Sequence, residues 1–232
     1  MCGRFTQLAP WAEVWAFSQP LTLAVPDAAA EPRWNIAPST PAWVIAHDGH
    51  GGAKAGAMRW GLVPHWAPDA KGGFSTINAR IETAADKPAF RDPWQRRRCL
   101  VPANGYYEWV TDAQGHKQPF YLQPAEAPLL MFAALWDRWA GPHDAPLLSF
   151  SIVTEAAEGA IATLHHRRPL MLQASQFAEW LTAPSSALVP LLASAPRPVL
   201  RWHAVGPAVG NPRNEGPTLV EPMPPVSLAP RP

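Results

Sequence analysis

The sequence has few charged residues and almost no excess charge of either sign. Only 16% of its 232 residues are charged, and 19 basic against 18 acidic side chains leave a net charge of +1. A protein that coats duplex DNA by bulk electrostatics needs a large positive excess, so this class is excluded. Because 47% of the residues are hydrophobic, the chain also differs from a disordered polyelectrolyte. The composition predicts a folded core.

Cysteine is equally scarce, with Cys2 and Cys99 the only two. Two cysteines cannot build a disulfide framework, and the sequence has no CxxC pair for a structural zinc. No apolar run approaches the roughly 18 residues that would span a bilayer, and the N-terminus lacks a basic-then-apolar signal. We therefore expect a soluble, cytoplasmic protein without a membrane anchor, nucleoid-associated if its source is bacterial.

Tryptophan and proline, in contrast, are abundant, with 12 and 29 residues. Twelve of the prolines fall in residues 184–232, where missing N–H groups disfavour long helices and central strands. We predict that this part is extended coil wrapped around the fold, with one possible strand at Val199–Val205. Residues 1–222 are expected to form a single domain, and residues 223–232 a disordered proline-rich tail.

Short apolar runs bounded by Gly, Pro or Asp predict strands through the middle of the chain. The segment Asp112–Gly115 between two runs predicts a hairpin loop. Helices are predicted at Pro10–Phe17, at Glu155–Leu164 with Thr154 as N-cap, and at Ser175–Leu181. The pattern favours an α+β fold with a mostly antiparallel sheet or barrel and short flanking helices. The expected strands are Ala42–His47, Met58–Val63, Arg98–Val101, Tyr106–Val110, Gln118–Leu122, Leu129–Leu135 and Leu147–Val153.

Cys2 directly follows the initiator methionine, so removal of Met1 would leave a cysteine at the N-terminus. Its α-amine (pKa about 8) and thiol (pKa about 8.5) would both be partly nucleophilic at neutral pH. Such a 1,2-aminothiol condenses with an aldehyde to an imine, and the thiol then closes a five-membered thiazolidine. The alternative is that a cysteine stands at this position by accident. Cys99 lies in an apolar run and predicts an inert core residue.

Glu108 lies in the aromatic segment Gly105–Trp109. A carboxylate among aromatic side chains is costly unless it is paired or functional, and burial would raise its pKa toward general acid–base use. Strand alternation equally allows Glu108 to face solvent, opposite Tyr107 and Trp109. The sequence leaves both alternatives open.

Two further segments carry polar groups. In His165–Pro169, two His and two Arg can bind an anion or present a titrating imidazole, and a metal site is less favoured because adjacent His rarely share one ion. Asn78, Arg80 and Glu82 would share one face of an extended segment.

The loop between Trp60 and Trp66 can present an aromatic ring to a base. Aromatics with scattered Arg fit a single-stranded nucleic-acid groove, although most of the Trp must be core.

Taken together, these segments resemble the SRAP family, the SOS response-associated peptidase-like proteins, over most of the chain up to about Gly216. The resemblance rests on nine motifs in the family's order: Met1–Phe5, Trp34–Pro38, Trp60–Pro64, Asn78–Thr83, Arg98–Ala103, Gly105–Trp109, Ser151–Thr154, His165–Pro169 and Val209–Asn211. It departs from the family at His166, where relatives often carry Asp or Asn.

The resemblance implies a DNA-damage function. It implies that the protein removes Met1 itself, crosslinks to abasic sites in single-stranded DNA through a thiazolidine, and so shields the lesion. Cys2 would be the nucleophile, Asn78 would position the amino terminus and the opened sugar, Glu108 would be the acid/base, and His165 would assist imine chemistry and crosslink reversal.

The resemblance also implies a set of DNA-contacting residues. Arg4 and Arg80 would hold phosphates, Thr154 would lie near the site, and the Trp60–Trp66 loop would wedge against bases. The chemistry requires no metal or cofactor, and nothing in the sequence demands more than a monomer. Two other classes stay open: a thiol peptidase or amidase that uses Cys2, His165 and Asn78 on other substrates, and a non-catalytic nucleic-acid binder.

Overall fold

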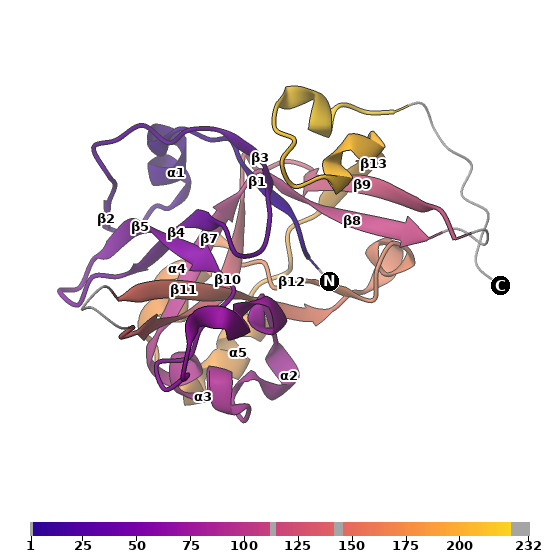
Figure 1. Cartoon of the computed structure of the whole chain (residues 1–232). Helices are drawn as coiled ribbons and strands as arrows, with labels where there is room; N and C mark the ends of the chain where they lie inside the picture. The colour runs from indigo at the N-terminus through magenta and orange to yellow at the C-terminus, as the bar shows by residue number, and fades with distance from the viewer. Residues whose placement is uncertain (1, 112–114, 142–145, 224–232) are drawn as a thin grey trace.

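The computed structural model describes residues 2–111, 115–141 and 146–223, and Figure 1 shows the path of the chain. The first layer is a closed five-stranded barrel. Four of its strand pairs are antiparallel, and the ring closes where β5 and β11 pair in parallel, with Trp60 beside Phe150. The barrel strands in spatial order are β11 (Leu147–Ala156), β10 (Leu130–Trp139), β7 (Arg98–Ala103), β4 (Pro41–His47) and β5 (Ala53–Trp60). Three short strands extend it: β2 (Leu23–Ala24) pairs with β5, while β6 (Asn78–Arg80) and β12 (Arg167–Pro169) pair with β11.

The second layer is an antiparallel five-stranded sheet. Its strand order is β13 (Leu200–Ala204), β9 (Lys117–Pro124), β8 (Gly105–Thr111), β1 (Phe5–Gln7) and β3 (Arg33–Ile36). The N-terminal strand β1 is thereby held between β3 and β8, in the register Phe5 opposite Tyr106. This pairing brings the start of the chain against the aromatic segment of β8.

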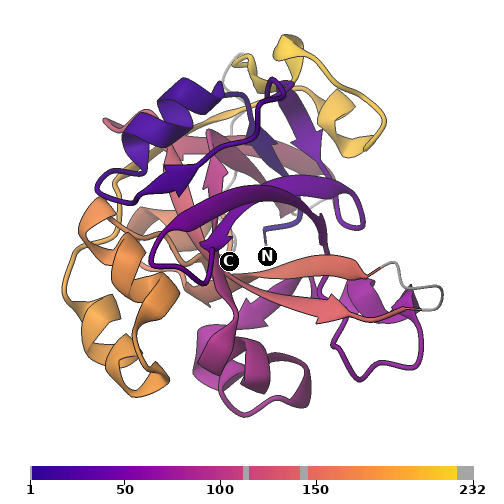
Figure 2. The same cartoon turned by 90° about the vertical axis from the view of Figure 1, so that its left-hand side faces the viewer.

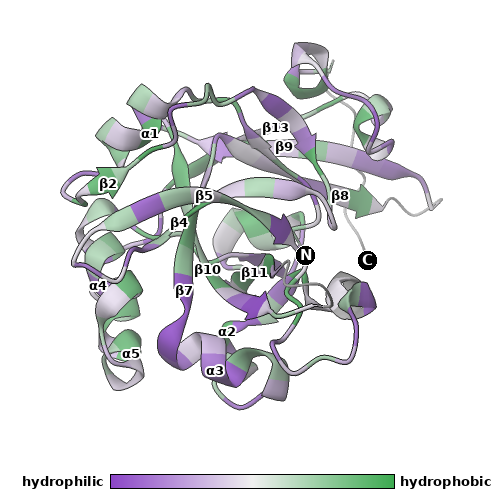
Figure 3. Cartoon of the chain, turned by 60° about the vertical axis from the view of Figure 1, so that its left-hand side comes forward, coloured by the Kyte–Doolittle hydropathy of each residue, from purple (hydrophilic) through white to green (hydrophobic). Residues whose placement is uncertain are grey.

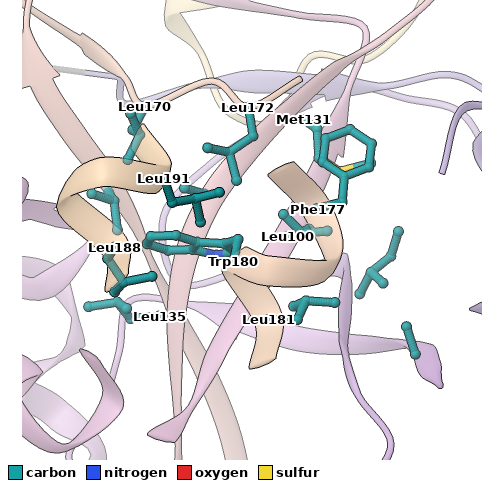
Figure 4. Close-up of a cluster of buried hydrophobic side chains, with 14 of the residues drawn as sticks. Leu100, Met131, Leu135, Leu170, Leu172, Phe177, Trp180, Leu181, Leu188 and Leu191 are labelled. Atoms are coloured by element: carbon teal, nitrogen blue, oxygen red, sulfur yellow. The ribbon is translucent and has the colours of Figure 1, made fainter. Parts of the chain in front are cut away.

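Side-chain alternation in the barrel strands separates two cores. In β10, Phe132 and its even-numbered neighbours face the barrel interior, where they meet residues from all five barrel strands, including Trp60 and Cys99. The odd-numbered residues, such as Leu135, face outward against helices. Trp180 fills this outer core, with leucines of the helices and strands around its ring (Figure 4). Cys99 is therefore a buried core residue, as the sequence predicts.

Short helices cover the outer face of the barrel (Figure 2). Figure 3 shows hydrophobic residues along the central strands and hydrophilic residues on the outlying turns. The α-helices are α1 (Trp11–Phe17), α2 (Ile81–Ala84), α3 (Pro88–Arg96), α4 (Phe177–Thr182) and α5 (Leu188–Ala193). The 3-10 helices are η1 (Ala70–Thr76), η3 (Gly159–Thr163), η4 (Ala174–Gln176), η5 (Ser185–Ala187), η6 (Pro207–Gly210) and η7 (Pro217–Val220). Within the described part of the chain, no helix combines the length and apolarity needed to cross a membrane.

Arg98 ties two of these helices to the barrel. It is 3% exposed, and its guanidinium donates to the carbonyl oxygens of Trp94 (2.6 Å) and Gln95 (3.1 Å) in α3. It also donates to the carbonyl oxygens of Trp180 and Ala183 at the end of α4. A cation that donates hydrogen bonds to the carbonyls at a helix C-terminus stabilises that end, so Arg98 stabilises the C-terminal ends of both α3 and α4. Arg98 is therefore a structural residue and not part of a solvated basic edge.

The architecture confirms the expected α+β class with a barrel and short helices. Six of the seven expected strands are present. The seventh, Met58–Val63, overlaps β5 only at residues 58–60, because the strand ends before Gly61, whose φ is +118°. The helix predicted at Glu155–Leu164 is wrong. Strand β11 continues to Ala156 because it pairs with β12, and Glu155 forms ion pairs with Arg168 (2.9 Å) and Arg197 (2.9 Å). Only the short η3 follows. Thr154 accordingly lies within a strand and is not an N-cap.

The proline-rich part of the chain is partly regular. It contributes the six-residue α5, three 3-10 helices and β13, which lies at the edge of its sheet, where proline is tolerated. Of the predicted tail, residues 224–232 lie outside the described residues, and so do residues 112–114 of the predicted hairpin loop. The strands that flank this loop, β8 and β9, pair antiparallel as predicted.

Candidate active site

Cys2 lies buried just ahead of β1. Its side chain has no exposed surface and belongs to the apolar cluster that contains Phe5, Trp60 and Tyr106. The thiol donates to the carbonyl oxygen of Arg4 at 3.8 Å. Burial raises the pKa of the Cys2 thiol well above its usual range, and the negative charge of Glu108 raises it further. The sulfur is therefore a neutral thiol until a reaction partner or a base acts on it.

Asn78 reaches Cys2 from the barrel. Strand β6 runs parallel to β11 with Asn78 opposite Ile152, and this pairing fixes the position of the amide. The Asn78 Nδ2 donates to the carbonyl oxygen of Cys2 at 2.9 Å. Within the described part of the chain, its Oδ1 is buried and accepts no hydrogen bond. The Asn78 side chain thus holds Cys2 through its Nδ2, and its Oδ1 remains available to accept a hydrogen bond.

Glu108 lies on the same face of β8 as Tyr106, and it is only 4% exposed. Tyr107 and Trp109 pack on the opposite face, against Val205 and its neighbours. The alternative in which Glu108 faces solvent is therefore wrong. Burial raises the pKa of the Glu108 carboxyl to about 7, against the opposing effect of the positively charged amino terminus. At neutral pH such a carboxyl is present both as acid and as base, as general acid–base catalysis requires.

His165 follows η3 and is oriented by backbone groups. Its Nδ1 accepts from the N–H of Arg167 at 2.9 Å and lies 3.1 Å from the carbonyl oxygen of the same residue. Its ring stacks on His166 with centroids 4.3 Å apart. With Nδ1 as acceptor, the neutral ring carries its proton on Nε2.

Arg167 anchors the backbone that holds His165. Its guanidinium donates to both carboxylate oxygens of Glu82 (2.6 and 2.9 Å) and to the carbonyl oxygen of Thr154 (2.6 Å). This hydrogen bond to Arg167 lowers the pKa of Glu82. Sequence reasoning expected Glu82 on one extended face with Asn78 and Arg80, which is wrong because β6 ends at Arg80 and Glu82 lies in α2.

Three of the expected DNA-contacting side chains are engaged within the fold. Thr154 is fully buried, and its Oγ1 accepts from Arg167 at 3.3 Å. Trp60 is fully buried in the barrel, stacked on Phe150, with its Nε1 donating to the carbonyl oxygen of Ile77 (2.9 Å). Neither side chain has exposed surface in this structure, and the roles expected for Thr154 and Trp60 at the DNA stay predictions.

Arg4, the third of these side chains, links the start of the chain to the 3-10 helix η6. It donates to Asn35 Oδ1 (2.7 Å) and to the carbonyl oxygens of Val209 (2.8 Å) and Gly210 (3.1 Å). The buried Asn35 amide in turn donates to the carbonyl of Val209 and to two more in the following turn. Sequence reasoning assigned no role to Asn35, although it lies within the motif Trp34–Pro38. Partial burial lowers the pKa of Arg4.

Trp66 and Arg80 remain on the surface. Trp66 is 57% exposed, in a loop held by the buried Asp137. That carboxylate accepts from the backbone N–H and the Nδ1 of His65 (both 3.0 Å) and from Arg97 (3.1 Å). Asp137 was not identified from the sequence, and its position in an apolar strand was the only available signal. Arg80 is exposed at the end of β6, two residues from Asn78.

The site thus combines a thiol, a carboxyl of raised pKa and an amide around the second residue of the chain. A buried thiol beside an acid–base carboxyl suits nucleophilic chemistry on an electrophilic carbon. Among the residues that the structure describes, no three His, Cys, Asp or Glu side chains gather where they would hold a metal ion.

Comparison with known proteins gives one family and one fold. The family model described as SOS response associated peptidase (SRAP) matches residues 1–212. The abasic site processing protein YoqW of Bacillus subtilis is 33% identical over 225 residues, which cover 95% of this chain and 99% of the relative. The abasic site processing protein YedK of Escherichia coli is 30% identical over 230 residues, or 96% of this chain and 100% of the relative.

A vertebrate relative and a solved structure extend the comparison. The abasic site processing protein HMCES of Gallus gallus is 31% identical over 193 residues, which are 72% of this chain and 56% of that longer protein. A crystal structure of a Bacteroides thetaiotaomicron protein superposes with a TM-score of 0.78 at 22% identity, covering 96% of this chain and 100% of the other. At this identity, the likeness shows the fold alone.

Proposed function

The chain belongs to the SOS response-associated peptidase family, and we propose that it processes abasic sites in DNA by capturing them covalently through Cys2. The observation that carries the proposal is the contact between Asn78 Nδ2 and the Cys2 carbonyl oxygen, 2.9 Å long, beside a Glu108 carboxyl that is 4% exposed. A thiol, an amide and an acid–base group around the second residue are what capture of an aldehyde by an N-terminal cysteine requires.

The first step is removal of Met1. One water molecule is consumed: its oxygen joins the carbonyl carbon of Met1, the bond to the Cys2 nitrogen breaks, and that nitrogen takes up a proton. The products are free methionine and a chain that begins with the α-amine of Cys2. The Asn78 amide fixes the backbone of Cys2 in this step, and the Glu108 carboxylate accepts the proton of the attacking water.

The second step joins Cys2 to the open-chain aldehyde of an abasic sugar. The amine adds to the aldehyde carbon, Glu108 protonates the hydroxyl that leaves as water, and a protonated imine results. The thiol proton then passes to the Glu108 carboxylate, the sulfur bonds to the same carbon, the C=N electrons move to nitrogen, and the thiazolidine ring closes. His165 assists the proton transfers of imine formation and of crosslink reversal.

DNA is held by residues at the surface. Arg80, which is exposed, and Arg4, which is partly exposed, contact phosphates beside the lesion, and the exposed Trp66 stacks on a neighbouring base. Stacking needs an unpaired base with a free face, which favours single-stranded DNA. The net charge of +1 suits this mode, because a local contact and one covalent bond replace extensive phosphate neutralisation.

The experiment is intact-protein mass spectrometry before and after incubation with a single-stranded oligonucleotide that contains one abasic site. We expect the protein to lack Met1 and to gain the mass of the oligonucleotide less one water. Cys2→Ala should abolish the adduct. Cys99→Ala, which removes the other buried thiol, should leave it intact. An adduct of equal yield with Cys2→Ala, or none with the parent protein, would contradict the proposal, and loss of Met1 without an adduct would favour a peptidase.

A further inference from the structure

Tyr106 carries a buried hydroxyl that the fold does not use. The side chain is fully buried and meets Phe132 edge-on, with centroids 6.0 Å apart. Within the described part of the chain, its Oη has no hydrogen-bond partner. The other two tyrosines are satisfied: Tyr107 donates to the carbonyl oxygen of Trp34 (2.8 Å), and Tyr121 pairs with the hydroxyl of Thr6 (2.9 Å). A buried polar atom without a partner is costly, so its presence points to a ligand or a reaction step.

The strand pairing places the Tyr106 side chain in the same neighbourhood as Cys2 and Glu108. Tyr106 shares one face of β8 with Glu108 and one apolar cluster with Cys2. The carbonyl oxygen of Arg4 accepts both the Cys2 thiol (3.8 Å) and the backbone N–H of Tyr107 (3.0 Å), so the sulfur lies against this segment of β8.

The hydroxyl keeps its proton throughout the working pH range. Burial raises the pKa of Tyr106 well above its usual value, and the nearby negative charges of Cys2 and Glu108 raise it further, while Arg168 acts in the opposite direction. A phenol that stays protonated cannot serve as a base, but it can donate a hydrogen bond.

We propose that the Tyr106 hydroxyl donates a hydrogen bond to the Cys2 sulfur as that sulfur becomes a thiolate, which makes Tyr106 a further catalytic residue for ring closure. The proposal rests on the proposed function and names a residue outside the set Cys2, Asn78, Glu108 and His165. An apolar site next to a carboxylate opposes a second negative charge, and a donor aimed at the sulfur offsets that opposition.

The step is balanced without any added reagent. The thiol proton passes to the Glu108 carboxylate, the sulfur electron pair forms the new C–S bond, and the C=N electrons return to the nitrogen of the protonated imine, which keeps its proton and becomes a neutral amine. Tyr106 keeps its proton from beginning to end. Its hydrogen bond is made to the charged sulfur and weakens as the neutral thiazolidine forms, so the contact favours the reacting state over the product.

The test compares Tyr106→Phe with Tyr107→Phe, the same change on opposite faces of one strand. Both proteins carry Cys99→Ser so that Cys2 is the only thiol. Thiolate formation is followed without DNA as the pH at which methyl methanethiosulfonate modifies half of the protein in a fixed time, read by intact mass, and this pH is the modification midpoint. The crosslinking rate is measured on an abasic oligonucleotide. For Tyr106→Phe we expect a modification midpoint higher by about one pH unit and a crosslinking rate about tenfold lower, since one pKa unit corresponds to a factor of ten.

Thermal unfolding separates a catalytic hydroxyl from a structural one. Tyr106→Phe should unfold at the same temperature as the parent or higher, because the lost hydroxyl has no partner in the fold. Tyr107→Phe, which loses its bond to Trp34, should unfold at a lower temperature with an unchanged modification midpoint. A lower Tm for Tyr106→Phe, or an unchanged midpoint and crosslinking rate, overturns the proposal.

The two readouts also keep this proposal distinct from the proposed function. If Tyr106→Phe shifts the modification midpoint but the parent forms no adduct with DNA, the contact with the sulfur stands and the proposed function fails. If the parent forms the adduct and Tyr106→Phe matches it in rate and midpoint, the proposed function stands and the role of Tyr106 is refuted.

Discussion

Replacing Glu108 by glutamine should stabilise the folded protein above neutral pH while it removes activity. Burial raises the pKa of Glu108 from an ordinary 4.5 to about 7. Between these two values the unfolded chain has released a proton that the folded chain still holds. The free energy of unfolding therefore falls as the pH rises through this window, and the fall is complete above pH 7. Glutamine has nearly the same shape and no proton to release, so the variant escapes this loss.

The magnitude follows from the size of the shift. One pKa unit corresponds to about 1.36 kcal/mol, so a rise of roughly 2.5 units costs about 3 kcal/mol at full ionisation. Between pH 5 and pH 8, the difference in unfolding free energy between Glu108→Gln and the parent should grow by about 2–3 kcal/mol. All other titrating groups contribute equally to both proteins and cancel in this difference, provided that both proteins have the same N-terminus. Intact-protein mass spectrometry verifies that the N-termini are the same.

Urea unfolding at pH 5, 6, 7 and 8 provides the measurement, with crosslinking rates taken on the same samples. Glutamine cannot transfer a proton, so the rate should fall roughly 100-fold or more. The matched control is Glu82→Gln. Its hydrogen bond to Arg167 lowers the pKa of Glu82 below the ordinary 4.5, so the stabilisation that the ionised Glu82 gives the folded protein is lost only at lower pH. The Glu82→Gln difference should stay level from pH 5 to 8. Parallel curves for Glu108→Gln and the parent would refute the reasoning.

Three further predictions concern the surface and the loop at Trp66. Trp66→Ala should weaken single-stranded DNA binding by about 1–3 kcal/mol, measured by fluorescence anisotropy, with the Tm of the protein unchanged. Trp60→Ala should instead lower the free energy of unfolding by about 3–5 kcal/mol. The reverse pattern would contradict the placement of Trp66 on the surface and Trp60 in the core. Arg80→Ala should reduce the slope of log K against log salt by about 0.7, and an unaltered slope would exclude a phosphate contact. Asp137→Ala should cost about 1–3 kcal/mol in urea unfolding, because the backbone N–H of His65 loses its acceptor while Arg97 keeps its ion pair with Asp92, and unchanged stability would show that Asp137 is dispensable.

Local sequence was sufficient where the signal lay in neighbouring residues. Apolar runs bounded by turn residues located most strands of the barrel and the strands β8, β9 and β13 of the second sheet, because alternation and chain punctuation act within a few residues. The short strands β1 and β3 were not predicted. The proposal for Cys2 likewise came from local sequence, since the cysteine that follows Met1 is read directly from it. The helix expected at Glu155–Leu164 failed because pairing between β11 and β12 and the ion pairs of Glu155 are made with residues distant in sequence.

Burial, in contrast, was decided by the tertiary structure. The sequence could not tell whether Glu108 faces solvent, or which tryptophan of the loop is core, because either face of a strand can be the inner one until its neighbours are known. Closure of the barrel through β5 and β11 buries Trp60 and leaves Trp66 outside. Pairing of β1 with β8 buries Glu108 beside Cys2 and raises its pKa.

The sequence by itself thus determined the family and singled out Cys2 as the proposed nucleophile, because both rest on contiguous motifs. Only the tertiary structure decided the environment of that nucleophile. Asn78 and Tyr106 lie far from Cys2 along the chain, and strand register brings the Asn78 amide to the Cys2 carbonyl and the Tyr106 ring into the apolar cluster of Cys2. Desolvation and hydrogen bonding, which set the reactivity of the thiol, are properties of that assembled neighbourhood and have no counterpart in any local stretch of sequence.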